Sequence, residues 1–375
     1  MNFRKSLAVV AAIGMALAAQ STPAQAADIA ITGSGSSFVS NYVEACRPIF
    51  TAAEGVNVTY NATGSGTGRS QFTANVVDFA ASDTVYSATE KAPASFVYVP
   101  LVAGPVAVMY NLPTVKQALN LSNDVLAKIF AGQITKWNDA EIAKINAVTT
   151  KVAKKDKAGK VVKQNGKIVY VTSSKPIALP NLPIQVYYRS DKSGTTEVFT
   201  DYLNQVVPSV FSKPKNGTFT SAFPGSIPTD GTFQGASGSD GVSSGVKSKP
   251  GAITYAEVSF AKERGLGIAS IENAAGKYLQ PTSKAASNFL SNFDLGKNGT
   301  IKANFKNPDP TAYNLSSFAY GLAYTAGQDD AKSAAVKKFL TYLTSGKCTA
   351  NAERLGYAPL SGDALGVAKL QIANI

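Results

Sequence analysis

The chain has 375 residues, of which 45% are hydrophobic and 16% charged, a composition typical of a globular protein with one or two large cores. Its formal net charge of +12 suits anionic ligands or surfaces and also aids solubility. The sequence contains no histidine, which excludes Ser-His-Asp and Cys-His catalytic sites and HExxH metal sites, so a zinc enzyme is not expected.

Residues 1–26 have the pattern of a cleavable secretory signal peptide. Arg4 and Lys5 precede an apolar run over 7–19, and small residues follow up to Ala26. Cleavage is expected after Ala26 or one residue later. No cysteine follows directly, so a lipid anchor is not expected. No other stretch approaches the roughly 18 apolar residues of a membrane-spanning helix. We therefore expect an exported protein, periplasmic or extracellular.

Two cysteines, Cys46 and Cys348, lie near opposite ends of the chain. An oxidising compartment permits a disulfide bond that would tie these ends together, and buried free thiols are the alternative. The distance between the two residues decides the question, and the sequence does not contain it.

Two glycine- and serine-rich turns occur early, each between a predicted strand and a predicted helix. The first, 33–38, follows a strand from residue 29 and precedes apolar residues at helical spacing. The second, 63–69, follows a β-branched strand over 56–60, and a flexible surface loop is its alternative interpretation. Unpaired N–H groups at such helix starts favour an oxyanion.

A third turn of this kind lies between a strand ending at Tyr188 and a helix that begins near Gly194. Arg189 lies just upstream of the helix start and would add a guanidinium group suited to an oxyanion. The alternative is an ordinary helix start with Ser193 or Gly194 as N-cap and Glu197 as its capping-box partner.

Asp83 ends a short apolar strand that begins at Val77. A carboxylate at the end of a strand in an α/β protein often lies in the ligand crevice, although Asp83 could also cap a helix or a turn.

The other segments alternate between strands and helices, which indicates an α/β fold. Apolar runs at 96–100 and 106–110 predict two buried strands, and helices are expected from residue 121 to 130 and near Ile142. Residues 214–250 are rich in Gly, Ser and Pro and predict loops with a short helix toward Val246. A strand is expected to follow them at 250–255, and a final helix over 331–343.

A lysine-rich insertion occupies residues 151–175, and its Asn165-Gly166 pair predicts a hairpin turn. Its charge could engage nucleic acid, an anionic polymer or a membrane. A solvated hairpin without a partner is the alternative, because the segment has few aromatic residues.

Several of these motifs, in the order in which they occur along the chain, resemble those of a known family. They are TGSGSSF at 32–38, GSGTG at 64–68, VDFAASD at 77–83, YRSDKSGTTEVFTDYL at 188–203, GSDGV at 238–242 and PGAITY at 250–255. Together they closely resemble the periplasmic phosphate-binding proteins of ABC-type phosphate uptake systems. The motif at 188–203 is especially similar to the DING branch, whereas the residues after the signal peptide depart from the DING signature.

The resemblance implies a type II periplasmic-binding-protein fold, in which two α/β lobes are joined by crossover strands and the ligand lies in the cleft. Lobe I would comprise residues 27–111 and 286–375, and lobe II residues 112–285, including the insertion.

The resemblance also implies a set of phosphate-binding residues: Ser37, Phe38, Ser65, Asp83, Arg189, Ser193, Gly194 and Thr195. Asp83 would accept a hydrogen bond from a protonated phosphate oxygen, and the others would donate from N–H, hydroxyl or guanidinium groups. In the second turn, Gly66-Thr67 replaces the serine-glycine that is more usual in the family.

The implied function is the binding of inorganic phosphate and its delivery to the permease subunits of an ABC transporter. We expect a monomer with no catalytic residues, no cofactor, no metal and no nucleic-acid partner. A secreted DING-like phosphatase, and an extracellular adhesion or matrix protein, are the alternatives. Arsenate and phosphonate are the alternative ligands.

Overall fold

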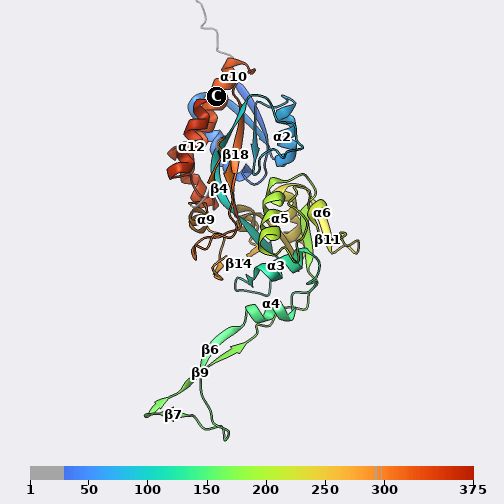
Figure 1. The fold of residues 1–375 in the computed structure, drawn as a ribbon, viewed down its shortest axis with the longest axis vertical. Coiled ribbons are helices and arrows are strands. Elements are labelled where there is room, and N and C mark those ends of the chain that lie inside the picture. Colours follow the sequence, from blue (N-terminus) through green and yellow to red (C-terminus); the bar gives the residue numbers. More distant parts are fainter. Residues whose placement is uncertain (1–28, 292–293, 297) are drawn as a thin grey trace, which may run out of the picture.

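The structure is a computed structural model that describes residues 29–291, 294–296 and 298–375. The predicted signal peptide lies outside these residues. The described part is a mixed α/β structure in two lobes with a long projecting arm (Figure 1).

A nine-stranded mixed sheet runs through both lobes in the order β11-β10-β12-β4-β18-β3-β1-β2, with β13 also beside β4. In that order the strands are β11 (Phe233–Ala236), β10 (Gln185–Arg189), β12 (Ala252–Glu257), β4 (Phe96–Tyr110), β18 (Ser316–Tyr324), β3 (Phe79–Ser82), β1 (Ala30–Gly35) and β2 (Asn57–Asn61), and β13 is Gly267–Ile268. Apolar side chains bury the long central strands β4 and β18 on both faces.

Strand β4 joins the two lobes. Its first part pairs with β18 and its last five residues pair with β12. The prediction of two separate strands, at 96–100 and 106–110, is therefore wrong. Ala319 and Tyr320 of β18 pair with Val102 and Pro100, so Leu101 of β4 is left without a partner beside Pro100. Such an irregularity lets a sheet accept a residue without an N–H group.

The parallel strands of the two lobes point toward each other. Strands β1, β2 and β3 are parallel in one lobe, and β10, β11 and β12 in the other. The antiparallel steps from β3 to β18, to β4 and to β12 reverse the direction three times. The carboxyl ends of the two parallel sets therefore face the same interlobe cleft.

Helices cover both lobes, and several of them begin directly after the loops at the cleft. They are α1 (Ser40–Glu54), α2 (Ser65–Thr73), α3 (Asn123–Phe130), α4 (Ala140–Ile145), α5 (Gly194–Val206), α6 (Phe219–Ala222), α7 (Gly238–Ser248), α8 (Val258–Arg264), α9 (Ser283–Leu290), α10 (Asp330–Leu343), α11 (Gly346–Leu355) and α12 (Gly362–Ala373). Within the described residues, none of the helices is both long enough and apolar enough to span a bilayer.

Helix α10 matches the helix expected at 331–343, but it is not the final one, because α11 and α12 follow. The buried residues of α11 are only Cys348 and Ala352, so its sequence has no strong apolar stripe. The predicted lobe boundary at 111/112 lies just after β4, and that at 285/286 falls inside α9. These bounds stay a prediction.

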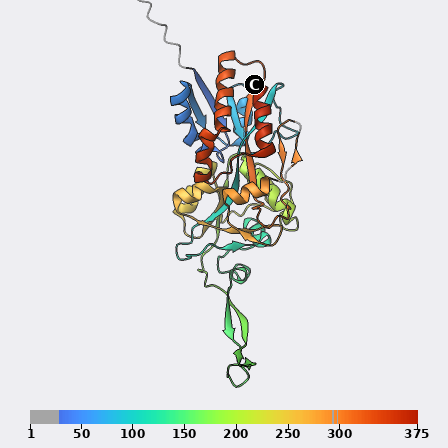
Figure 2. The same cartoon turned by 90° about the vertical axis from the view of Figure 1, so that its left-hand side faces the viewer.

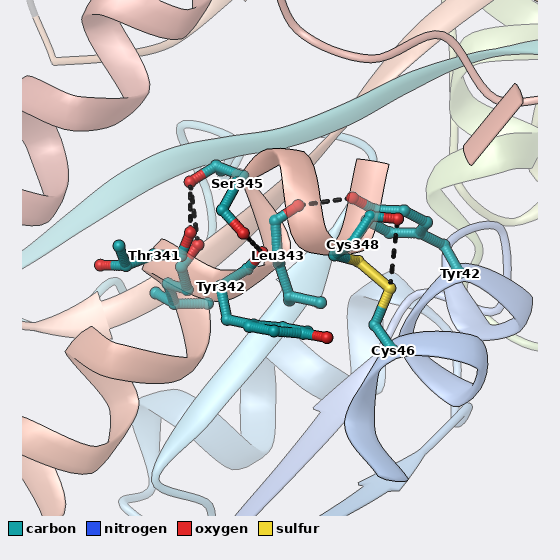
Figure 3. The surroundings of a disulfide bond; sticks show 9 residues. Tyr42, Cys46, Thr341, Tyr342, Leu343, Ser345 and Cys348 are labelled. Atoms are coloured by element: carbon teal, nitrogen blue, oxygen red, sulfur yellow. Dashed lines mark hydrogen bonds between the residues drawn. A yellow bond between two sulfur atoms is a disulfide. The ribbon is translucent and has the colours of Figure 1, made fainter. Parts of the chain in front are cut away.

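Cys46 of α1 and Cys348 of α11 form a disulfide bond, with 5.6 Å between their Cα atoms (Figure 3). Both cysteines are fully buried. Beside them, the hydroxyl of Tyr42 donates a hydrogen bond to the backbone oxygen of Leu343. The bond ties the first helix to the C-terminal helices, which answers the question that the sequence left open.

The lysine-rich insertion forms an arm that projects from lobe II, as two views at right angles show (Figures 1 and 2). Strand β6 (Val148–Ala153) pairs with β9 (Tyr170–Lys175), and β7 (Lys163–Gln164) pairs with β8 (Lys167–Ile168) at the tip. Asn165 and Gly166 join β7 to β8 with φ angles of 50° and 76°. The predicted hairpin turn is therefore confirmed.

Two small sheets complete the described strands. One holds β5 (Asn120–Leu121), β14 (Ser270–Glu272) and β15 (Tyr278–Leu279), and the other β16 (Asp294–Leu295) and β17 (Ile301–Lys302).

Candidate functional site

Four loops meet at the cleft, each between the carboxyl end of a strand and the start of a helix. They join β1 to α1, β2 to α2, β10 to α5 and β11 to α7. The end of β3 adds Asp83. The three turns that the sequence singled out are therefore side by side, and the β11–α7 loop, expected only as part of a loop region with a short helix, is a fourth. Its helix α7 has 11 residues.

Asp83 lies at the centre of the contacts between the lobes. Its Oδ1 accepts a hydrogen bond from the Ser36 hydroxyl, and its Oδ2 accepts one of 2.8 Å from the Thr195 hydroxyl of the other lobe. Its N–H donates to Ser65 Oγ at 3.2 Å. Burial raises the pKa of Asp83 above its ordinary value, although these two hydroxyls and the guanidinium groups of Arg189 and Arg69 act in the opposite direction.

Helix α5 begins with one cap residue and two unused donors. The hydroxyl of Ser193 accepts the Thr196 N–H at 3.1 Å, and the Ser193 N–H donates to the oxygen of Gly217 at 2.9 Å. Ser193 is thus the N-cap, and its own donor is occupied. Within the described residues, no protein acceptor contacts the N–H groups of Gly194 and Thr195, the first two of the helix.

The predicted capping box is wrong, because the Ser193 N–H that Glu197 would need is bonded to Gly217. The carboxylate of Glu197 instead accepts a hydrogen bond of 3.0 Å from the hydroxyl of Thr84, in the other lobe. This side chain therefore joins the lobes rather than the helix start.

Arg189 is held in place by Asp191, which is two residues further along the chain. Arg189 Nε donates to Asp191 Oδ1 at 2.7 Å, and its Nη2 donates to Oδ2. Asp191 Oδ1 also accepts the N–H of Gly238 at 2.9 Å. Burial raises the pKa of Asp191, but the hydrogen bonds and charge of Arg189 outweigh it and lower the pKa overall. The ionised pair fixes the guanidinium plane while Nη1 lies 3.5 Å from Ser239 Oγ.

The first loop contributes serines rather than an aromatic side chain. Ser37 Oγ accepts the N–H of Ser239 at 3.0 Å, which links the β1–α1 loop to α7 across the cleft. The Phe38 N–H donates to Ser36 Oγ at 3.0 Å, and the Phe38 ring packs in the core with its centroid 6.0 Å from that of Tyr357. Ser36 therefore supplies the side chain that reaches Asp83, and Phe38 supports the loop from behind.

The two lobes approach each other closely at Gly194. A Cβ atom added to Gly194 would lie 2.4 Å from Ser65 Oγ and 2.9 Å from Asp83 Cβ. The next loop makes a similar contact, because the Gly66 N–H donates to the oxygen of Lys192 at 2.9 Å. The structure thus has its lobes closed on each other at the candidate site.

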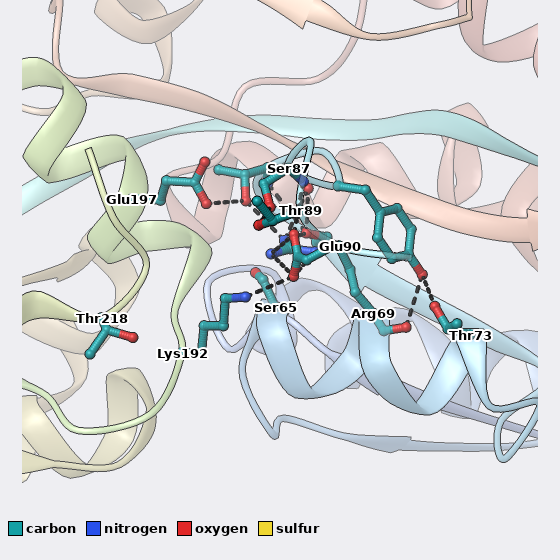
Figure 4. Close-up of polar contacts among 12 residues, drawn as sticks. Ser65, Arg69, Thr73, Ser87, Thr89, Glu90, Lys192, Glu197 and Thr218 are labelled. Atoms are coloured by element: carbon teal, nitrogen blue, oxygen red, sulfur yellow. Dashed lines mark hydrogen bonds and ion pairs between the residues drawn. The ribbon is translucent and has the colours of Figure 1, made fainter. Parts of the chain in front are cut away.

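Glu90 bridges the lobes at the edge of the site (Figure 4). It forms an ion pair of 3.0 Å with Arg69 of α2 and one of 2.9 Å with Lys192 of the loop before α5. Burial raises the pKa of Glu90, but the Ser87 N–H and these two cations outweigh it and lower the pKa to about 2. The bridge is therefore ionised at physiological pH.

A cavity of about 570 Å³ lies between the lobes beside Asp83. Residues from the end of β3, from α5 and from β18 line it, among them Thr84, Glu197 and Ser317. Asp83 belongs both to the packed cluster of donors and to the wall of this cavity.

The structure brings together the residues that the sequence proposed and adds others. The added residues, which were not predicted from the sequence, are Ser36, Asp191, Gly238 and Ser239. Asp191 follows Arg189 closely enough to suggest a pair, and Ser239 lies in the GSDGV motif, which was noted without a site residue. Within the described residues, no group of three or more Cys, Asp or Glu side chains is arranged to hold a metal ion.

The family model of the PBP superfamily domain matches residues 18–347 of the chain. The chain belongs to the PBP superfamily.

Relatives of this superfamily member are named phosphate-binding proteins. The phosphate-binding protein PstS of Haemophilus influenzae is 29% identical over 345 residues, which cover 91% of this chain and 92% of that protein. PstS of Xylella fastidiosa is 30% identical over 272 residues, covering 72% of this chain and 65% of that protein. PstS 3 of Mycobacterium tuberculosis is 35% identical over 245 residues, 64% of this chain and 54% of that protein. The chain thus spans less than two thirds of the length of the last two of these relatives.

Solved structures show the same fold. A phosphate-binding protein from Stenotrophomonas maltophilia has a TM-score of 0.63 at 20% identity, covering 91% of this chain and 93% of that one. A high affinity periplasmic phosphate-binding protein of the DING type, bound with phosphate, has a TM-score of 0.64 at 22% identity with the same coverage. The predicted resemblance to periplasmic phosphate-binding proteins and the predicted two-lobe α/β fold are both confirmed.

Proposed function

We propose that the chain binds inorganic phosphate in the interlobe cleft and delivers it to an ABC transporter for phosphate uptake. The observation that carries the proposal is the position of Asp83, a buried acceptor among donors from both lobes. Lobe I supplies the Ser36 hydroxyl, and lobe II supplies the Thr195 hydroxyl, the free N–H groups at the start of α5 and the guanidinium of Arg189. The names of the relatives support phosphate as the anion.

Asp83 gives the site a way to choose between oxyanions. Phosphate near neutral pH keeps a proton that an ionised carboxylate can accept, whereas sulfate carries none. Sulfate would leave a buried carboxylate unpaired beside a second negative charge. Such a mismatch costs several kcal/mol, which is roughly three decades in affinity.

The two lobes would close on phosphate and present it to the membrane permease subunits of the transporter. The predicted signal peptide places the protein outside the cytoplasm, in the periplasm or beyond it, where we expect it to act as a monomer. Relatives and structural neighbours are named as binding proteins, and we propose binding without turnover.

Equilibrium dialysis with labelled phosphate, alone and with excess sulfate, tests the proposal. The wild type should bind one phosphate that sulfate does not displace. Asp83→Asn replaces the acceptor by a donor, so phosphate should bind about tenfold to a hundredfold more weakly and the preference over sulfate should shrink. Asp363→Asn, which alters an exposed carboxylate on α12, is the matched control and should bind as the wild type does.

The pH dependence gives an independent readout. Because the pKa of Asp83 is raised, the carboxylate should start to protonate, and phosphate affinity to fall, at a higher pH than for an ordinary aspartate. Asp83→Asn should lack this acid limb. If the wild type retains no phosphate, or if sulfate competes equally, the proposal is wrong; steady release of phosphate from p-nitrophenyl phosphate would favour the phosphatase alternative.

A further inference from the structure

The arm at 148–175 carries most of the excess positive charge of the protein. It has eight lysines and a single acidic residue, Asp156, so it contributes +7 to a total of +12. Two of the remaining charges, Arg4 and Lys5, belong to the predicted signal peptide. Without the arm and the signal, the chain is close to neutral. The charge is therefore a property of this one element and not of the surface as a whole.

The arm is not needed to complete the core. All of its residues are exposed except Ala153, Val162 and Val169, which are half-buried where the tip folds back on the strands. In the part of the chain that the structure describes, no ion pair joins an arm lysine to a carboxylate. Like charges crowded on a thin ribbon repel each other.

Apolar side chains lie exposed among these lysines. Val152 pairs directly with Val171 across the two strands. Val148, Thr150 and Val152 lie on the same face of β6. Val148 is 54% exposed and Val152 42%. Tyr170, on the opposite face, is 58% exposed. Both faces of the ribbon thus combine cations with aliphatic or aromatic side chains that contact water.

We infer that the arm docks on the surface of an anionic lipid membrane. Lysines next to phosphate headgroups gain electrostatic attraction, while the valines and the tyrosine can enter the boundary between headgroups and acyl chains. A soluble polyanion would use the lysines but leave the valines in water. A single-stranded nucleic acid would need several stacking aromatic residues, and the arm has only Tyr170.

This inference is independent of the proposed phosphate site, because the arm shares no residue with it. Docking would hold the protein near a membrane, and it would do so whichever ligand occupies the cleft.

Co-sedimentation with vesicles tests the inference on the mature protein. The wild type should bind vesicles of equimolar phosphatidylcholine and phosphatidylglycerol, should not bind phosphatidylcholine alone, and should be released by salt. The variant K154Q/K155Q/K157Q/K160Q should lose roughly fivefold in affinity per lysine, hence about six-hundredfold in all. The control K247Q/K249Q/K277Q/K306Q removes the same charge from exposed lysines of the body and should bind like the wild type.

A second variant separates a membrane from a soluble polyanion. V148T/V152T/V171T keeps the charge and the strand propensity, and it should weaken vesicle binding about tenfold while leaving any binding to soluble polyphosphate unchanged. Dialysis with labelled phosphate should show that all variants remain folded. Failure of the wild type to bind anionic vesicles overturns the inference, and so does equal vesicle binding by the valine variant, which would mark the arm as a general polyanion surface.

Discussion

Charges at the candidate site are matched residue by residue. Arg189 is paired with Asp191, and Arg69 and Lys192 share Glu90, which leaves Asp83 as a buried carboxylate held by hydroxyls. An anion would thus be bound in a place without surplus positive charge. The N–H groups at the helix starts must supply much of the attraction, and Asp191 serves to aim the guanidinium rather than to repel the ligand.

Glu257 is a buried carboxylate outside the candidate site, at the end of β12 and opposite Val106 in the strand that joins the lobes. It is fully buried, its Oε2 accepts the Ser259 N–H at 2.9 Å, and no hydrogen bond from the described part of the chain reaches its Oε1. Burial raises its pKa to about 8, although Ser259, Tyr357 and Lys262 act in the opposite direction. The folded protein therefore keeps this side chain protonated near neutral pH.

We expect Glu257→Gln to remove part of the pH dependence of folding. Below the ordinary pKa of 4.5 the side chain is protonated in both states, and between 4.5 and about 8 only the unfolded chain ionises. The raised pKa thus stabilises the fold at low pH, and the wild type should lose about 1.4 kcal/mol of unfolding free energy per pH unit across this window. Glutamine mimics the protonated acid and should avoid the loss.

Urea unfolding at several pH values measures this difference. The advantage of Glu257→Gln over the wild type should grow from about pH 5 to about pH 8 and then level off. Glu353→Gln, at an exposed position of α11, should show no such trend. Parallel curves for Glu257→Gln and the wild type would mean that the side chain ionises in the folded protein as it does in the unfolded chain.

Among the structural elements, those with a periodic apolar pattern could be predicted from the sequence, and those defined by their partners could not. Alternation and helical spacing located the strand and helix around Ser193. The join within β4 depends on β18 and β12, which follow it far along the chain, so the two apolar runs were predicted as separate strands. Ser239 was missed because its partner, Ser37, becomes a neighbour only when the loops meet. Asp191 lies only two residues from Arg189, so this pair could have been predicted from the sequence.

The disulfide between α1 and α11 is the covalent tie among these elements. It closes a segment of 302 residues, and a long loop loses much conformational freedom in the unfolded chain when it is closed. We expect Cys46→Ser/Cys348→Ser to lower the free energy of unfolding by about 2–5 kcal/mol and to leave phosphate binding unchanged, because neither residue lies at the cleft.

Chemical unfolding with and without reductant checks this effect. The reductant should destabilise the wild type to the level of the double serine variant and should not affect that variant. Equal stability of the two proteins without reductant would show that packing around Tyr42 and Leu343 holds these helices without the bond.

For the whole molecule, the contacts between the lobes determine whether the cleft can close. The lobes meet through the Asp83–Thr195 and Ser37–Ser239 hydrogen bonds and through the Glu90–Lys192 ion pair. Strand β4 passes between them without interruption. Closure therefore brings small residues of the two lobes into contact, and a single methyl group added at such a contact should oppose it.

Gly194→Ala tests this closure. The Gly194 backbone does not have the positive φ that favours glycine, and alanine is the better helix former by up to about 1 kcal/mol, so the variant should fold at least as stably as the wild type. Its Cβ would lie 2.4 Å from Ser65 Oγ of the other lobe, and overpacking of this kind costs about 1–3 kcal/mol. Phosphate should therefore bind about tenfold to a hundredfold more weakly, chiefly through faster release. Calorimetric titration and stopped-flow release measure these effects. The control is Gly366→Ala, at a helix position where an added Cβ meets no atom within 4 Å, and it should keep wild-type affinity. Wild-type affinity in Gly194→Ala as well would show that phosphate binds without this contact between the lobes.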